Sequence, residues 1–132
     1  MNQEVIKIDL PKIIDERGNL SYFENGSQLP FDIKRVYWIY DVPGGETRGG
    51  HAYKKQKEFI TVLSGSIDIV IKNKLGEEKK VCLNRSYKGL YLPNGVWKHM
   101  ENFSTNALAL IVSDSFFCEE DYIRDWNEYI SY

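Results

Sequence analysis

The chain has 132 residues, of which 42% are hydrophobic and 14% aromatic, and its formal net charge is −2. This length and apolar content predict one folded domain over residues 1–132 and argue against intrinsic disorder. The near balance of 17 basic and 19 acidic side chains gives no electrostatic reason to expect nucleic acid or an anionic membrane as a partner.

No stretch of the sequence approaches the roughly 20 apolar residues needed to span a bilayer. The first residues also lack the apolar run of a signal peptide, so we expect a cytoplasmic protein. Cys82 and Cys118 are far apart in the sequence and have no close cysteine partner. We therefore expect free thiols, and neither a metal clip nor a disulfide framework.

Short segments rich in β-branched and aromatic residues follow one another along most of the chain, as is typical of strands. Turn residues separate them, for example at Asp15–Asn19, Asp41–Gly45 and Ser64–Ser66. The segments expected to be strands are 5–10, 20–24, 33–40, 59–63, 67–71, 79–83, 90–92, 98–103 and 107–113. Many short strands with Gly and Pro turns predict an all-β sandwich or jelly-roll barrel.

Only the last part of the chain has apolar residues at helical spacing. Over residues 119–132 they are Tyr122, Ile123, Trp126, Tyr129 and Ile130. We expect a short C-terminal helix here, packed on the barrel or on a second subunit.

Two groups of residues have the spacing of the two-part motif found in metal-binding cupins. The first group is Gly45, His51, Tyr53, Glu58 and Gly65, and the second is Gly89, Pro93–Gly95, Lys98 and Asn102. Metal-binding cupins usually have histidine at the positions of Tyr53 and Lys98. The spacing is therefore kept while two of the ligands are replaced by a phenol and an ammonium group.

These replacements argue against a metal. Because side chains alternate along a strand, His51 and Tyr53 share a face, and the motif brings Glu58 and Lys98 to the same barrel mouth. A first-row metal needs three or four N, O or S ligands, and only His51 and Glu58 are good ones. His99 would point away from Lys98. We expect no metal and no cofactor.

The same side chains suit acid–base chemistry. Histidine has an unperturbed pKa of about 6.5 and can both take and give a proton near neutral pH. A neighbouring phenol can relay a proton, while Lys98 or Arg17 can stabilise negative charge on a carbonyl oxygen. These parts suit proton abstraction beside a ketone followed by reprotonation elsewhere.

Several blocks of the sequence resemble the sugar-nucleotide 3,4-ketoisomerase family of cupins, also described as WxcM-like. They are residues 13–18, 33–39 and 48–55, with shorter matches at 89–91, 96–97 and 121–124. The resemblance implies a cupin jelly-roll (a double-stranded β-helix barrel) and a homodimer, often with exchanged N-terminal strands. It implies conversion of dTDP-4-keto-6-deoxy-D-glucose into a dTDP-3-keto-6-deoxyhexose, which supplies 3-amino sugars for bacterial surface glycans.

The family's catalytic base maps onto His51. We expect the other residues that handle protons or charge during catalysis to be Tyr37, Tyr53, Lys98 and Arg17. We expect substrate contacts from Arg48, whose planar fork suits a diphosphate, and from Arg35, Glu58 and Trp97. Trp97 stacks on the thymine or merely packs. The configuration of the product at C4, galacto or gluco, stays open.

Other functions share the same pocket. They are a metal-dependent cupin enzyme, a non-catalytic nucleotide-sugar-binding module and an epimerase that acts on the same 4-keto sugar. The fold alone does not separate them.

Overall fold

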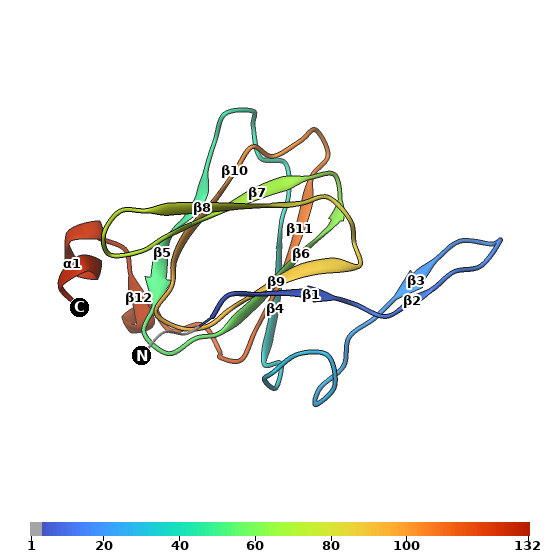
Figure 1. Cartoon of the computed structure of the whole chain (residues 1–132), viewed down its shortest axis with the longest axis horizontal. Coiled ribbons are helices and arrows are strands. Elements are labelled where there is room, and N and C mark those ends of the chain that lie inside the picture. Colours follow the sequence, from blue (N-terminus) through green and yellow to red (C-terminus); the bar gives the residue numbers. More distant parts are fainter. Residues whose placement is uncertain (1–3) are drawn as a thin grey trace.

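The computed structural model describes residues 4–132 and consists mainly of antiparallel strands (Figure 1). One five-stranded sheet has the order β1-β9-β6-β11-β4, and the other has the order β12-β5-β10-β7-β8. The first sheet comprises β1 (Ile6–Asp9), β9 (Lys88–Leu92), β6 (Glu58–Ser64), β11 (Leu108–Ser113) and β4 (Arg35–Ile39). The second comprises β12 (Tyr122–Ile123), β5 (Arg48–Tyr53), β10 (Trp97–Glu101), β7 (Ile67–Lys72) and β8 (Glu78–Leu83).

A core of aliphatic side chains fills the space between the two sheets. Alternation along β6 sends Ile60 and Val62 into this core, together with Ile69 of β7 and Ile111 of β11. Glu58 belongs to the same face of β6 but lies at the end of the strand, where the aliphatic core stops. One end of the barrel interior is therefore polar.

A third, two-stranded sheet lies apart from the barrel. β2 (Lys12–Ile13) and β3 (Leu20–Ser21) form a hairpin that projects from the right-hand side of the molecule in Figure 1. The sequence predicted one strand over 5–10 and another over 20–24. The structure instead ends β1 at Asp9 and pairs Ile13 with Leu20.

The helix predicted over 119–132 is wrong in its first half. Residues Glu119–Asp121 form a 3-10 turn (η1), Tyr122 and Ile123 form β12, and α1 covers only Trp126–Ser131. Tyr122 pairs with Tyr53 and Ile123 with Ala52, so strand pairing with β5 overrides the helical spacing. Asp125 caps α1 by accepting a hydrogen bond from the backbone N–H of Asn127.

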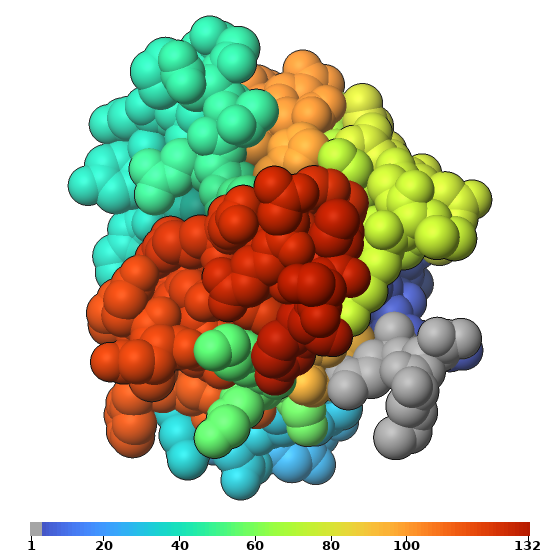
Figure 2. All heavy atoms as spheres, turned by 90° about the vertical axis from the view of Figure 1, so that its left-hand side faces the viewer, coloured from blue at the N-terminus to red at the C-terminus, as the bar shows by residue number. Residues whose placement is uncertain are grey.

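The C-terminal segment covers one end of the barrel. In Figure 2 the red C-terminal segment lies over this face of the molecule. Ile123 is fully buried, and Trp97, Trp126 and Tyr129 pack against it. The Tyr129 hydroxyl also donates to the carbonyl oxygen of Gly95 at 2.9 Å, just before β10 begins. This segment therefore fixes the position of β5 and β10.

A bulge in β5 follows from the glycine pair in the sequence. Lys98 lies opposite His51 and Met100 lies opposite Arg48, so Gly49 and Gly50 together face the single residue His99. Gly49 has φ = 79°, and a Cβ atom there would approach Met100 Cε to 3.3 Å. Gly49 therefore permits both the backbone turn and the close approach of β10, immediately before His51.

None of the helices in residues 4–132 is long and apolar enough to span a membrane.

Candidate active site

A cavity of about 420 Å³ opens at the polar end of the barrel, between β4 on one sheet and β5 and β10 on the other. It is lined by Tyr37, Ile39, Thr47, Arg48, Gly49, Gly50, His51, Tyr53, Lys98, Met100, Tyr122 and Arg124. The structure thus brings together five residues predicted from the sequence, namely His51, Tyr37, Tyr53, Lys98 and Arg48.

His51 is held by two tyrosine rings. Its ring centroid lies 4.8 Å from that of Tyr53 and 4.9 Å from that of Tyr122, in edge-to-face geometry. The two tyrosine rings are themselves 4.7 Å apart, which closes a three-ring cluster. The imidazole orientation is therefore fixed by packing before any ligand enters.

Burial and two nearby cations keep His51 neutral. Burial, then the charge of Lys98 and then that of Arg124, lower the pKa of the imidazole to about 3. Lys98 Nζ lies 3.4 Å from His51 Nε2. An ammonium group only donates hydrogen bonds, so Nε2 is the acceptor and the ring hydrogen lies on Nδ1. The Nε2 lone pair thus points at Lys98, and the imidazole itself lines the cavity.

Lys98 and Glu58 form a buried ion pair behind His51. Lys98 Nζ is 2.9 Å from Glu58 Oε1, and the two side chains are only 3% and 2% exposed. The Tyr37 hydroxyl donates to Glu58 Oε2 at 2.7 Å, and the side-chain amide of Gln56 donates to the same oxygen at 3.3 Å. Glu58 does not line the cavity, so its carboxylate acts on the lining side chains and not directly on a ligand.

This donor set does not fit a metal ion. The two good ligands of the motif are His51 and Glu58, and the ammonium group of Lys98 lies within 3.4 Å of one and 2.9 Å of the other. A bound divalent cation would share this space with a positive charge. Among residues 4–132, no cluster of three or more His, Cys, Asp or Glu side chains has the geometry of a metal site.

Two arginines make the cavity positive. Arg48 lies before the bulge in β5, and Arg124 follows β12. Glu119 holds Arg124 through two hydrogen bonds of 3.0 Å, and the Arg124 guanidinium lies 4.1 Å from the centroid of the Tyr122 ring. Arginine forks of this kind bind phosphate oxygens in pairs. The cavity can therefore hold an anionic ligand.

Besides Glu58, three more of the predicted residues do not line the cavity. Arg17 lies in the loop of the β2–β3 hairpin, 89% exposed, and forms an ion pair with Asp15 at 2.8 Å. Arg35 lies behind Tyr37, with its guanidinium 4.8 Å from that ring centroid. Trp97 packs against Trp126 and Tyr129. Of the two roles expected for it, stacking on the thymine or packing, the structure shows packing.

The sequence analysis does not predict Tyr122, Arg124 or Gln56 as site residues. Tyr122 and Arg124 lie in the block 121–124 that resembles the family, and this resemblance is the signal in the sequence that points to them. The helical spacing of the segment conceals their position, because β12 in fact pairs with β5 and places Tyr122 beside His51. Gln56 comes close to Glu58 only through the turn before β6.

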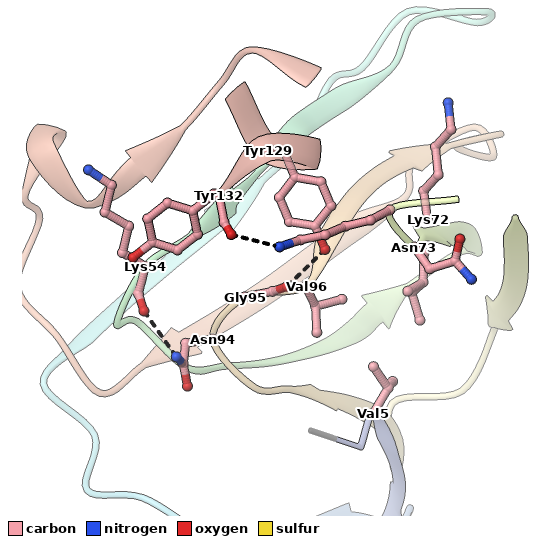
Figure 3. Close-up of a pocket in the computed structure, with 11 residues that line it drawn as sticks. Val5, Lys54, Lys72, Asn73, Asn94, Gly95, Val96, Tyr129 and Tyr132 are labelled. Carbon is pink, nitrogen blue, oxygen red and sulfur yellow. Dashed lines mark hydrogen bonds between the residues drawn. The ribbon is translucent and has the colours of Figure 1, made fainter. Parts of the chain in front are cut away.

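A second and larger cavity, of about 580 Å³, lies near α1 and is lined in part by Lys54, Lys72 and Lys74 (Figure 3). The ammonium groups of Lys54 and Lys72 point in different directions, and that of Lys74 donates to the carbonyl oxygen of Tyr132 at 3.0 Å. No histidine or carboxylate side chain lines it. It therefore lacks the acid–base groups of the first cavity.

Comparisons with known proteins agree with this geometry. Residues 2–132 match the family described as FdtA (WxcM-like, C-terminal). The TDP-4-oxo-6-deoxy-α-D-glucose-3,4-oxoisomerase of Aneurinibacillus thermoaerophilus is 35% identical over 125 residues, covering 95% of this chain and 89% of that protein.

Two solved structures show the same fold. A histidine-to-asparagine mutant of the 3,4-ketoisomerase QdtA from Thermoanaerobacterium thermosaccharolyticum, in complex with TDP-4-keto-6-deoxyglucose, superposes with a TM-score of 0.94 at 37% identity. That match covers 99% of this chain and 94% of the other. The TDP-quinovose 3,4-ketoisomerase WlaRB from Campylobacter jejuni gives a TM-score of 0.91 at 37% identity, covering 99% of this chain and all of the other.

The predicted all-β jelly-roll is confirmed by these likenesses. The full-length family match, the identities of 35–37% and a cavity built around one neutral histidine lead to one conclusion. The chain belongs to the FdtA, or WxcM-like, family of sugar-nucleotide 3,4-ketoisomerases.

Proposed function

We propose that this protein converts dTDP-4-keto-6-deoxy-D-glucose into its 3-keto isomer in the cytoplasm, and so supplies the substrate for a 3-amino sugar of a bacterial surface glycan. The observation that carries the proposal is the neutral His51, which lines a cavity together with two arginines, Arg48 and Arg124. Removal of a proton next to a ketone requires a base, and positively charged side chains nearby stabilise the negative charge that develops.

Each group has a task in this reaction. His51 takes the proton from C3, which is acidified by the C4 ketone. Arg48 and Arg124 bind the diphosphate and so hold the sugar against the base. The positive charge of Lys98 stabilises the enediolate that spans C3 and C4. Tyr53 and Tyr122 hold the imidazole in place.

The test uses the sugar nucleotide itself. The protein is incubated with dTDP-4-keto-6-deoxy-D-glucose in D₂O, and the sugar is followed by NMR. We expect the 3-keto isomer without added metal or nicotinamide. The variant His51→Asn should lose both isomer formation and deuterium exchange at C3, while it still binds dTDP. The matched control is His99→Asn, because this second histidine lies on β10 outside the cavity and should leave turnover intact.

Absence of both isomer and exchange in the wild-type protein would contradict the proposal and favour a non-catalytic binding module. Full activity in His51→Asn would assign the base to another residue.

We further propose that the active form is a homodimer in which the β2–β3 hairpin reaches the partner subunit. The hairpin leaves the barrel (Figure 1). It exposes Ile13, Ile14 and Leu20, with Ile14 74% exposed. Apolar side chains on a projecting hairpin favour a protein contact. In this arrangement Arg17, which lies away from its own cavity, contributes to the cavity of the partner.

Mixing inactive variants tests this arrangement. Arg17→Ala and His51→Asn should each lower turnover as homodimers. Subunit exchange between them should restore part of the activity, because one cavity of the mixed dimer has both groups. A monomer in light scattering, or no recovery after exchange is verified, would contradict it.

A further inference from the structure

Two aspartates tie the loop before β12 to the turn between β5 and β6. The backbone N–H groups of Lys55 and Gln56 donate to the two carboxylate oxygens of Asp121, at 2.8 and 3.0 Å. The N–H of Lys54 donates to the backbone carbonyl oxygen of Asp121 at 2.9 Å. The next N–H of the turn, at residue 57, donates to the carboxylate of Asp114 at 2.9 Å. The loop 114–121 is therefore held at both ends by one turn.

Side-chain burial does not hold the chain that leads to Asp121. The side chains of residues 116–120 are all exposed, and η1 has no buried residue. β12 then contributes only two paired residues, Tyr122 and Ile123, and a pairing this short stabilises little by itself. The two bonds to the Asp121 carboxylate are charge-assisted and hence stronger than neutral ones. They are the main polar anchor of this segment on the barrel.

The three bonds to Asp121 also specify the register of β12 on β5. In the observed register Ile123 is fully buried, whereas Tyr122 and Arg124 both line the cavity. A slip of one residue would exchange these sides, because neighbouring residues of a strand point in opposite directions. The Tyr122 ring would then leave the imidazole of His51, from which its centroid is now 4.9 Å away.

We infer that Asp121 is a positioning residue for the active site, which holds β12 in the register that places Tyr122 against His51 and Arg124 in the cavity. The inference rests on the proposed function, because it takes Arg124 to bind the diphosphate and Tyr122 to orient the base. Asp121 itself does not line the cavity and acts only through these two side chains.

A second route from Asp121 to the cavity would run through the turn. The side-chain amide of Gln56 donates to Glu58 at 3.3 Å, so a displaced turn would disturb the ion pair with Lys98. Asp114 binds the same turn, but it follows β11 and lies at the opposite end of the loop from β12. Equal substitutions of the two aspartates therefore separate the two routes.

The first experiment compares Asp121→Ala with Asp114→Ala. Both variants lose backbone hydrogen bonds of the turn, so both should unfold at a lower temperature than the wild-type protein. In calorimetric titrations Asp121→Ala should raise the Kd for dTDP about tenfold, whereas Asp114→Ala should keep it within about twofold. Asp121→Ala should also lower kcat about tenfold or more, because the imidazole loses the ring that orients it. Equal changes in the two variants, or an unchanged Kd in Asp121→Ala, would overturn the inference.

A gentler substitution covers the case in which Asp121→Ala does not fold. The amide of Asp121→Asn has one acceptor oxygen and keeps at most one of the two side-chain bonds. It should raise the Kd for dTDP about threefold, between the wild-type protein and Asp121→Ala. A wild-type Kd and kcat in Asp121→Asn would contradict the inference.

Amide hydrogen exchange reads the position of the segment without any ligand. Residues 119–124 should exchange faster in Asp121→Ala than in Asp114→Ala, while β6 and β7 keep their protection in both. Unchanged protection of residues 119–124 in Asp121→Ala would show that the carboxylate does not hold β12.

The closing experiment is a double-mutant cycle with Arg124→Met. If Asp121 acts on binding through Arg124, Asp121→Ala should raise the Kd for dTDP less than about twofold in the Arg124→Met background. A full tenfold increase in that background would assign the effect to another route and overturn the inference. Wild-type protein that neither binds dTDP nor forms the isomer contradicts the proposed function instead, so the two failures are distinguishable.

Discussion

Removing one member of the buried Lys98–Glu58 pair should destabilise the protein far more than removing both. At 2.9 Å and an effective dielectric constant of about 20, their attraction is on the order of 6 kcal/mol. Loss of one partner leaves the other charge buried, at a typical cost of about 3–5 kcal/mol. This is a large part of the roughly 5–15 kcal/mol that stabilises an ordinary domain.

The two single variants should differ. In Lys98→Met, the carboxylate of Glu58 still accepts hydrogen bonds from Tyr37 and Gln56, so we expect a cost near the lower end, about 3 kcal/mol. In Glu58→Leu, the ammonium of Lys98 keeps the long contact to His51 and a position 5.1 Å from the centroid of the Tyr53 ring, but no carboxylate, so we expect about 4–5 kcal/mol. The double variant Lys98→Met/Glu58→Leu has an apolar pair in place of the ions and should lie within about 2 kcal/mol of the wild-type protein.

The assay is urea unfolding at neutral pH, followed by tryptophan fluorescence and evaluated as a double-mutant cycle. We expect a coupling energy of several kcal/mol. If each single variant cost less than about 1 kcal/mol, or if the two costs simply added in the double variant, the side chains would not form a desolvated pair and the argument would fail.

Two other perturbations test the surroundings of the cavity. The pKa of His51 falls from 6.5 in the unfolded chain to about 3 in the folded protein, so the unfolded chain takes up a proton first as the pH falls. The free energy of unfolding is therefore unaffected by this group above about pH 6.5 and declines between pH 6.5 and pH 3. The measurement is the free energy of unfolding in urea at several pH values. In this pH range it should fall more steeply in the wild-type protein than in His51→Asn, by up to about 1.4 kcal/mol per pH unit. Equal slopes in the two proteins would show that the histidine is not desolvated. Gly89→Ala should cost about 2–3 kcal/mol, because a Cβ atom at this position would lie 2.2 Å from the Phe59 ring and 2.7 Å from the carbonyl oxygen of Ile60. Gly44→Ala, whose Cβ would meet nothing within 4 Å, is the matched control and should change the free energy of unfolding by no more than about 0.5 kcal/mol; similar effects of the two substitutions would contradict the steric account.

The sequence by itself determined the class of fold and several of the side chains that line the cavity. Alternation and turn residues predicted most of the strands, and the two-part spacing predicted that His51, Tyr53 and Lys98 converge, as they do. These signals are local or have a fixed spacing, so they are visible in a single sequence.

Only the tertiary structure decided which groups touch. Residues 122–123 have helical spacing, but a free edge of β5 was available, and pairing with it brought Tyr122 to His51. Spacing placed Glu58 at the site, but only the packing of β6 against β10 showed that its carboxylate lies behind the cavity in an ion pair with Lys98. The link from His51 through Lys98 and Glu58 to Tyr37 joins the consecutive strands β4, β5 and β6 to β10, which is distant from them in sequence. Strand pairing and side-chain burial depend on what the rest of the chain places nearby, and that information has no local signature.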